Sequence, residues 1–113
     1  MPDKIRMTTS VASVLREFLE APTEHQYGFD LMQRCGLSSG SLYPILARLE
    51  KAEWIVGRFE EIDPSKEGRR PRKYYTLTAA GARAAVCELD LLSERFKPPV
   101  WDFGSKPATG GAW

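Results

Sequence analysis

Residues 37–55 constrain the fold more than any other part of the 113-residue chain, because apolar side chains recur along them at helical spacing. These apolar positions form one stripe along a helix: Leu42, Ile45, Leu46 and Leu49. Ser38 is expected to cap the helix, because its hydroxyl can accept a hydrogen bond from a backbone N–H one turn later. The opposite face carries small hydroxyls, a tyrosine and an arginine: Ser39, Ser41, Tyr43 and Arg48. Such side chains suit phosphates and base edges, so this face is a candidate for contact with DNA. The alternatives are that Arg48 pairs with a neighbouring acid, that Tyr43 is half core and half phosphate donor, and that Ser39 and Ser41 only cap the helix.

Pro44 lies in the same segment and limits where the regular helix begins. If the helix starts at Ser39, Pro44 falls beyond the first turn and removes one backbone hydrogen bond. The alternatives are a tight or irregular first turn, or a regular helix that begins near Pro44, where the missing N–H would have no partner anyway. The sequence leaves this choice open.

Two further helices are expected before this one. The first is capped within residues 8–10, stops at residues 21–22 and has apolar side chains at helical spacing: Val11, Val14, Leu15, Phe18 and Leu19. The second covers residues 27–35, with an inward face made of Tyr27, Leu31, Met32 and Cys35. Gly36 follows where a left-handed helix end is typical. Two helices joined by a short turn with glycine are typical of a helix-turn-helix. Residues 1–7 are mixed and predict a strand or an arm.

Two strand candidates follow, residues 54–62 and residues 74–77, the second rich in β-forming side chains. The loop between them has Gly and Pro punctuation and many cations. From residue 66 to residue 73 the only acid is Glu67, and five residues are basic: Lys66, Arg69, Arg70, Arg72 and Lys73. A charge run of this kind is often a solvated loop, but here it lies at a hairpin tip beside the candidate DNA-binding helix. We therefore predict that four of these cations contact DNA phosphates, giving affinity and salt dependence rather than sequence choice: Arg69, Arg70, Arg72 and Lys73.

A fourth helix is expected from Ala79 to about Phe96, with Thr78 as its cap. Its apolar side chains alternate three and four residues apart, as in a helix that pairs with another helix: Ala82, Ala85, Leu89, Leu92 and Phe96. This seam can pack on its own domain or on a second copy of the chain, and we favour a homodimer interface. Residues 98–113 are rich in Gly and Pro and predict a flexible tail.

The overall composition narrows the location of the protein. The formal net charge is +1, so the distribution of charge rather than its sum has to indicate a partner. No apolar run approaches the roughly 18 residues of a membrane-spanning helix, and the first residues lack the apolar stretch of a signal peptide. We expect a cytoplasmic protein with no membrane contact. Cys35 and Cys87 show no metal-type spacing and are expected to be small core residues in a reducing compartment.

Sequence signatures of catalysis are missing. The chain has no Gly-rich phosphate loop, no histidine or cysteine cluster and no motif that places a nucleophile beside a base. We therefore expect that the protein is not an enzyme and needs neither a cofactor nor a metal.

Four short motifs, in this order, resemble the PadR family of bacterial transcriptional regulators. They are Tyr-Gly at 27–28, Ser-Leu-Tyr-Pro-Ile-Leu-Ala-Arg-Leu-Glu at 41–50, Arg-Lys-Tyr-Tyr at 72–75 and Leu-Thr-Ala-Ala-Gly at 77–81. The resemblance covers about residues 11–95. Glu53 departs from it, since such proteins usually have a glycine at the end of the recognition helix; a left-handed turn at Glu53 has a small conformational cost.

The resemblance implies a repressor that dimerises through the fourth helix with help from the first. Two recognition helices would then enter successive major grooves of a pseudo-palindromic operator in double-stranded DNA, and the hairpins would follow the flanking backbone or minor groove. It also implies that a small-molecule effector at the dimer interface, or another signal, releases the DNA.

The predicted fold class is mainly α with a small β hairpin, a winged helix-turn-helix followed by a dimerisation helix. We expect a DNA-binding domain at residues 1–77, a dimerisation helix at residues 78–97 and a flexible tail at residues 98–113. The predicted function is sequence-specific regulation of transcription by a dimeric repressor. The alternative is a winged-helix module that binds proteins and not DNA, which would have no need of clustered arginines in the wing.

Overall fold

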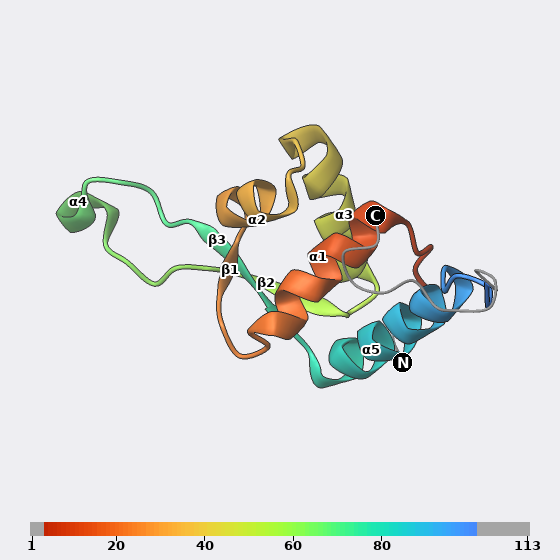
Figure 1. The fold of residues 1–113 in the computed structure, drawn as a ribbon. Helices are drawn as coiled ribbons and strands as arrows, with labels where there is room; N and C mark the ends of the chain where they lie inside the picture. The colour runs from red at the N-terminus through yellow and green to blue at the C-terminus, as the bar shows by residue number, and fades with distance from the viewer. Residues whose placement is uncertain (1–3, 102–113) are drawn as a thin grey trace.

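The computed structural model describes residues 4–101 and is built mainly of helices with one small sheet (Figure 1). The elements, in chain order, are α1 (Thr9–Glu20), β1 (Gln26–Tyr27), α2 (Gly28–Cys35), α3 (Ser39–Lys51), β2 (Ile55–Phe59), α4 (Pro64–Glu67), β3 (Lys73–Leu77) and α5 (Ala79–Arg95). The predicted fold class is confirmed. The three helices before the hairpin and the long helix after it all occur where the apolar periodicity placed them.

Local sequence signals fix the helix ends. Thr8, Ser38 and Thr78 cap α1, α3 and α5, each side chain accepting from the backbone N–H three residues later at 3.2, 3.3 and 2.8 Å. Gly36 ends α2 with φ of 66°, a left-handed conformation that glycine adopts without a steric penalty. The caps predicted at Ser38 and Thr78 and the glycine end at Gly36 are therefore confirmed.

α3 begins at Ser39 and carries Pro44 inside it, so the regular helix does not begin near Pro44. Pro44 has no N–H to give to the carbonyl of Gly40, and Gly40 is exposed at the start of the helix. The helix ends at Lys51. The prediction that one helix covers the whole of residues 37–55 is therefore wrong at its end. Glu53 turns the chain with φ of 65°, so the left-handed turn survives without its usual glycine.

The sheet has three antiparallel strands in the order β1-β3-β2. Pairing between β2 and β3 runs from Ile55 opposite Leu77 to Phe59 opposite Lys73, so β2 is shorter than the predicted strand at residues 54–62. The additional strand β1 places Tyr27 opposite Tyr74 and removes Tyr27 from the second helix, where the periodicity had assigned it. We call β2, β3 and residues 60–72 between them the wing; it projects from the body of the molecule (Figure 1).

The hydrophobic core lies between α1, α2, α3, the base of the sheet and the first half of α5. Its members are almost completely buried: Val11, Val14, Leu15, Phe18, Leu31, Leu42, Ile45, Leu46, Leu49, Ala52, Trp54, Ile55, Tyr75 and Ala85. Burial of each large apolar side chain contributes about 1.5–3 kcal/mol. The predicted stripe of α3 is therefore part of this core.

The predicted seam of α5 divides into two parts. Ala85 is 0% exposed and belongs to the core of its own domain, so it is not available to a second copy, contrary to the prediction. Leu89 packs partly on the same core. Ala82 and Leu92 are half-buried, and Phe96 just beyond the helix is 67% exposed. Helical periodicity correctly identified the apolar face of α5. Part of that face, however, packs on the core of the same chain.

The described residues before α1 and after α5, 4–8 and 96–101, form no helix or strand. Residues 4–7 form an arm rather than a strand, and Ile5 and Met7 pack against the core. The predicted flexible tail lies, from residue 102 onward, outside the described residues. Cys35 is half-buried, whereas Cys87 is exposed and is not the core residue that was expected. None of the helices between residues 4 and 101 is both long and apolar enough to cross a membrane.

Candidate nucleic-acid interface

The outer face of α3 is free of the core along its whole length. All four side chains predicted to contact DNA from this helix are exposed: Ser39, Ser41, Tyr43 and Arg48. Lys51, one turn after Arg48, is exposed as well and was not among the predicted residues. Its i,i+3 spacing from Arg48 is the signal that could have identified it.

The structure bears on two of the alternative interpretations, capping by Ser41 and ion pairing by Arg48. Ser41 takes part in capping, because its backbone N–H and its hydroxyl both lie 3.3 Å from the Ser38 hydroxyl. Arg48 could have paired with a neighbouring acid, but no ion pair joins it to any residue between 4 and 101. Arg48 is therefore free to meet an external anion.

Tyr43 packs directly against the beginning of α2. A Cβ at Gly28 would collide with the Tyr43 hydroxyl, so the glycine leaves room for the tyrosine ring in its present position. The two helices and β3 enclose a concave surface of about 280 Å³, lined by Tyr27, Gly28, Phe29, Tyr43, Arg72, Lys73 and Tyr75. Aromatic rings, a phenol and two cations thus meet beside the outer face of α3.

Glu60 organises the cations of the wing. Its carboxylate accepts from the Arg69 guanidinium at 2.6 Å and from the Arg72 backbone N–H at 2.8 Å. The Tyr27 hydroxyl donates to it at 3.2 Å, and the Arg72 guanidinium lies 3.6 Å away. These donors lower the pKa of Glu60 from its ordinary 4.5 to about 2, the hydrogen bond from Arg69 being the largest cause. This role of Glu60 was not predicted from the sequence, because it joins residues that are distant in the chain.

The remaining predicted wing cations are held differently. The Arg72 guanidinium also lies 4.5 Å from the centre of the Tyr27 ring, a cation–π contact. Within the described part of the chain, the Arg70 guanidinium has neither a hydrogen bond nor an ion pair. Asp63 begins the short helix α4 at the tip by accepting from the Ser65 backbone N–H at 3.0 Å. The Arg70 guanidinium is therefore unpaired among the described residues, close to the helix α4 at the tip of the wing.

Lys73 connects the wing to α3. Its ammonium lies 3.3 Å from the Glu50 carboxylate, and both side chains are 37% exposed. A Cβ at Gly57 would lie 2.8 Å from a Glu50 oxygen, so the glycine leaves room for this ion pair. The pair fixes the base of the wing beside the helix that it flanks.

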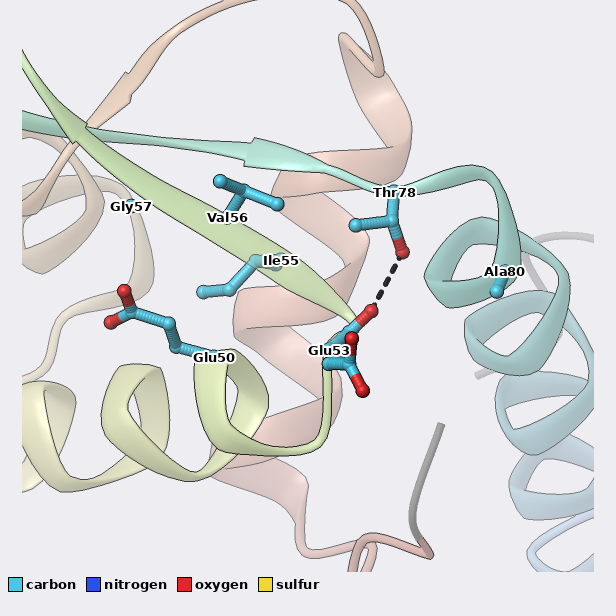
Figure 2. Close-up of a pocket in the computed structure, with 7 residues that line it drawn as sticks. All are labelled: Glu50, Glu53, Ile55, Val56, Gly57, Thr78 and Ala80. Carbon is cyan, nitrogen blue, oxygen red and sulfur yellow. Dashed lines mark hydrogen bonds between the residues drawn. The ribbon is translucent and has the colours of Figure 1, made fainter. Parts of the chain in front are cut away.

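On the other side of this ion pair, α3, β2 and α5 meet at a depression of about 370 Å³, lined by Glu50, Glu53, Ile55, Val56, Gly57, Thr78 and Ala80 (Figure 2). The Thr78 hydroxyl donates across it to the Glu53 carbonyl at 2.9 Å. A Cβ at Gly81 would collide with the backbone of Trp54. The start of α5 is therefore joined closely to the end of α3.

No three His, Cys, Asp or Glu side chains of residues 4–101 are grouped so as to hold a metal ion.

The geometry brings together a helix-turn-helix, with the outer face of α3 exposed, and a β hairpin whose cations lie beside that face. This arrangement defines the winged helix-turn-helix class.

A comparison with known families matches residues 19–86 to the transcriptional regulator PadR-like family. The chain therefore belongs to the PadR-like family of transcriptional regulators, as the four sequence motifs indicated. No curated protein matches the chain.

Solved structures share the fold. The circadian clock associated protein Pex from anabaena is 24% identical over 76% of each chain, with a TM-score of 0.57. S. aureus MepR in a DNA complex is 15% identical over 80% of this chain and 68% of that one, with a TM-score of 0.61. Overoxidized AbfR bound to DNA is 23% identical over 80% of this chain and 61% of that one, with a TM-score of 0.61. MepR has also been solved with ethidium bromide.

Proposed function

We propose that this transcriptional regulator binds double-stranded DNA by placing the outer face of α3 in the major groove and the wing on the adjacent backbone. The observation that carries the proposal is the continuous surface on which Tyr43 of α3 and the wing residues Arg72 and Lys73 line one concavity. The DNA complex of MepR, a protein of the same fold, supports this choice over a winged helix that binds only proteins.

The predicted site residues take two roles in this proposal. Arg48, Ser39 and Ser41 would read base edges or fix the helix on nearby phosphates, and Tyr43 would donate its hydroxyl to a phosphate. The wing cations would contact phosphates without reading sequence: Arg69, Arg70, Arg72 and Lys73. Bacterial operator DNA is in the cytoplasm, so the protein would act in that compartment.

Homodimerisation through α5 is part of the proposal, since two copies of α3 would read a pseudo-palindromic operator. Because Ala85 is covered by its own domain, the interface would use the apolar side chains that α5 leaves open: Val86, Leu91, Leu92 and Phe96. Residues 1–77 would then carry the DNA contacts and residues 78–97 the association, with the first half of α5 serving both.

We further propose that the dimer represses transcription and that a small molecule or another signal relieves the repression. An effector at the dimer interface would act by changing the distance between the two copies of α3. The ethidium complex of MepR shows that a protein of this fold can hold a small molecule. Repression is testable by transcription in vitro from a promoter that contains the operator.

The direct test of DNA binding is fluorescence anisotropy with a labelled duplex taken from upstream of the protein's own gene. A scrambled duplex of equal length is the control, and both are titrated over a salt series. We expect tighter binding to the native duplex and a steep fall of affinity with salt, because phosphate contacts release counterions. Weak and equal binding to both duplexes would contradict regulation at this site and favour the protein-interaction module.

The dimer interface is tested by Leu92→Asp, which places a charge on the open part of the α5 face. Ser93→Asp is the matched control, because it adds the same charge at an exposed neighbouring position. We expect light scattering to find monomers for Leu92→Asp and dimers for Ser93→Asp. A dimer that tolerates both substitutions would exclude this face. Leu89→Asp is less informative, since Leu89 packs partly on its own core.

A further inference from the structure

The outer face of α3 has two sides, and the wing covers only one of them. Glu50 marks the wing side, because its carboxylate contacts Lys73. Arg48 and Lys51 belong to the other side, where the N-terminal arm passes next to the second half of α3. None of the residues predicted from the sequence to bind DNA belongs to this arm.

The arm and α3 together form a second basic surface. They enclose a concavity of about 250 Å³ lined by Lys4, Ile5, Arg6, Arg48, Lys51 and Ala52. We call its four cations, Lys4, Arg6, Arg48 and Lys51, the arm cluster. All four are exposed, and none of the described residues that line the concavity is acidic.

The arm cluster is held in place by apolar contacts. Ile5 is half-buried and packs against the hydrophobic core, which fixes the backbone between Lys4 and Arg6 beside α3. No ion pair or hydrogen bond neutralises any of the four cations within residues 4–101. Like charges repel, so their position depends on the packing of Ile5 and not on mutual attraction.

Part of the cluster has a simpler explanation that does not extend to the rest. Arg48 and Lys51 lie in the last turn of α3, where cations interact favourably with the negative end of the helix dipole. Lys4 and Arg6 belong to no helix, and their presence at the same concavity is unexplained by the dipole. An external anion accounts for all four.

We propose that the arm cluster binds phosphates of the DNA strand that borders the major groove on the side away from the wing; this deepens the proposed function and rests on it. A helix of about 10–12 Å diameter fills a groove of about 12 Å width, so a backbone lies on each side of it. The wing supplies cations to one of these backbones. The arm cluster supplies cations to the other.

The test is the double variant Lys4→Ala/Arg6→Ala, which removes two exposed cations and leaves Ile5 in place. Its matched control is Arg83→Ala/Lys97→Ala, which removes the same charge from exposed positions of α5 and the residue after Phe96. Affinities for the native and the scrambled duplex are measured over a salt series. We expect the slope of log K against log salt to become shallower by about 0.9 for each lost phosphate contact, equally on both duplexes.

Arg70→Ala in the wing is measured beside these variants to separate two kinds of failure. If Arg70→Ala makes the slope shallower and Lys4→Ala/Arg6→Ala does not, the arm cluster does not bind phosphate while the proposed function stands. If none of the variants changes the slope, both the arm-cluster proposal and the proposed function fail. If the control Arg83→Ala/Lys97→Ala makes the slope shallower by the same amount, the effect comes from the net charge of the protein. That result would overturn the assignment of the arm cluster.

Hydroxyl-radical footprinting on the native duplex locates the contact. We expect Lys4→Ala/Arg6→Ala to lose protection of one short stretch of backbone in each half-site, while the stretch that Arg70→Ala affects stays protected. Loss of the same stretch in both variants would contradict the assignment of the arm cluster to the second strand.

Discussion

On the wing side of α3 three cations are paired with acids, since Glu60 holds Arg69 and Arg72 and Glu50 holds Lys73, while Arg70 has no acidic partner among the described residues. On the arm side, no such pair forms within the described residues for Lys4, Arg6, Arg48 or Lys51. Paired cations have a fixed position but a weak external field, whereas unpaired cations have a full field and less fixed side chains. Three of the wing cations are therefore fixed in position by acids, whereas Arg70 and the four cations of the arm side keep their full field.

The first prediction concerns the close packing that only the wing side has. Gly28→Ala would place a Cβ 2.9 Å from Cζ of Tyr43 and nearer still to its hydroxyl oxygen. Overpacking of this kind destabilises by about 1–3 kcal/mol, to be measured as a lower free energy of unfolding in urea. Adding Tyr43→Phe removes the nearest atom and should recover part of the loss.

Gly40→Ala in α3 is the matched control for Gly28→Ala, because the nearest atom to its new Cβ would be the Ser38 hydroxyl at 3.9 Å. In a helix, alanine at such an open position stabilises by about 0.4–1 kcal/mol. A Gly28→Ala protein as stable as Gly40→Ala would mean that Tyr43 moves freely and that the wing side is not tightly packed.

The second prediction compares two neighbouring arginines of the wing. Arg70→Ala should weaken DNA binding on the order of tenfold at low salt, since a lost hydrogen bond to a charged group is worth about 1.5–3 kcal/mol. Arg69→Ala should weaken it less, because Arg69 is already held by Glu60 at 2.6 Å. Arg69→Ala/Arg70→Ala should weaken binding on all sequences and flatten the salt slope by about one unit per lost contact. Anisotropy would contradict the comparison if Arg69→Ala had the larger effect.

The third prediction uses pH to examine Glu60. Its folded-state pKa of about 2 is below the ordinary 4.5, so the ionised carboxylate stabilises the folded protein above about pH 4.5. This contribution is lost as the pH falls from about 4.5 toward about 2. Glu60→Gln lacks it at every pH, so its deficit in urea midpoint should shrink through this window. A deficit that is constant with pH would mean that Glu60 acts only through its shape.

Glu60→Gln would also leave cations of the wing without an acidic partner, as the cations of the arm side are. Without the carboxylate, Arg69 and Arg72 lose their acidic partner and present more positive charge to DNA. At neutral pH we expect a steeper salt slope and tighter binding to the scrambled duplex. Unchanged non-specific binding would mean that the two arginines do not reach the backbone.

The smallest expected effect is that of the ion pair between Glu50 and Lys73. Both side chains are 37% exposed, so solvent screens the pair and a double-mutant cycle to alanine should give a coupling of about 0.2–1 kcal/mol. The coupling should fall further at high salt. A larger value that salt does not change would indicate that the pair is more deeply enclosed than its exposure suggests.

Signals that depend on a few neighbouring residues were readable from the sequence. Ser38 and Thr78 cap the starts of their helices by local hydrogen bonds, and Gly36 ends a helix by its backbone conformation. Each does so as predicted. The outward-facing residues of α3 followed from the buried stripe in the same way. The four PadR motifs identified the family because they lie in segments whose local structure is fixed.

Features that depend on distant parts of the chain were not readable. β1 is two residues long and exists because Gln26 and Tyr27 pair with β3. The periodicity of α5 shows which side chains share a face, but only the fold shows that Ala85 is covered by its own domain. Glu60 looked like one acid among several, since its partners Tyr27 and Arg69 lie 33 and 9 residues away.

The joint between α3 and α5 has a mechanical consequence. The Thr78 hydroxyl donates to the Glu53 carbonyl at 2.9 Å while its oxygen accepts the Gly81 N–H at 2.8 Å, and no side chain separates Gly81 from the Trp54 backbone. Because the two backbones meet there without an intervening side chain, a rotation of α5 would be passed on to the end of α3. α3 is about 20 Å long, so in a dimer built on α5 each degree of helix rotation would move the Ser39 end by about 0.3 Å.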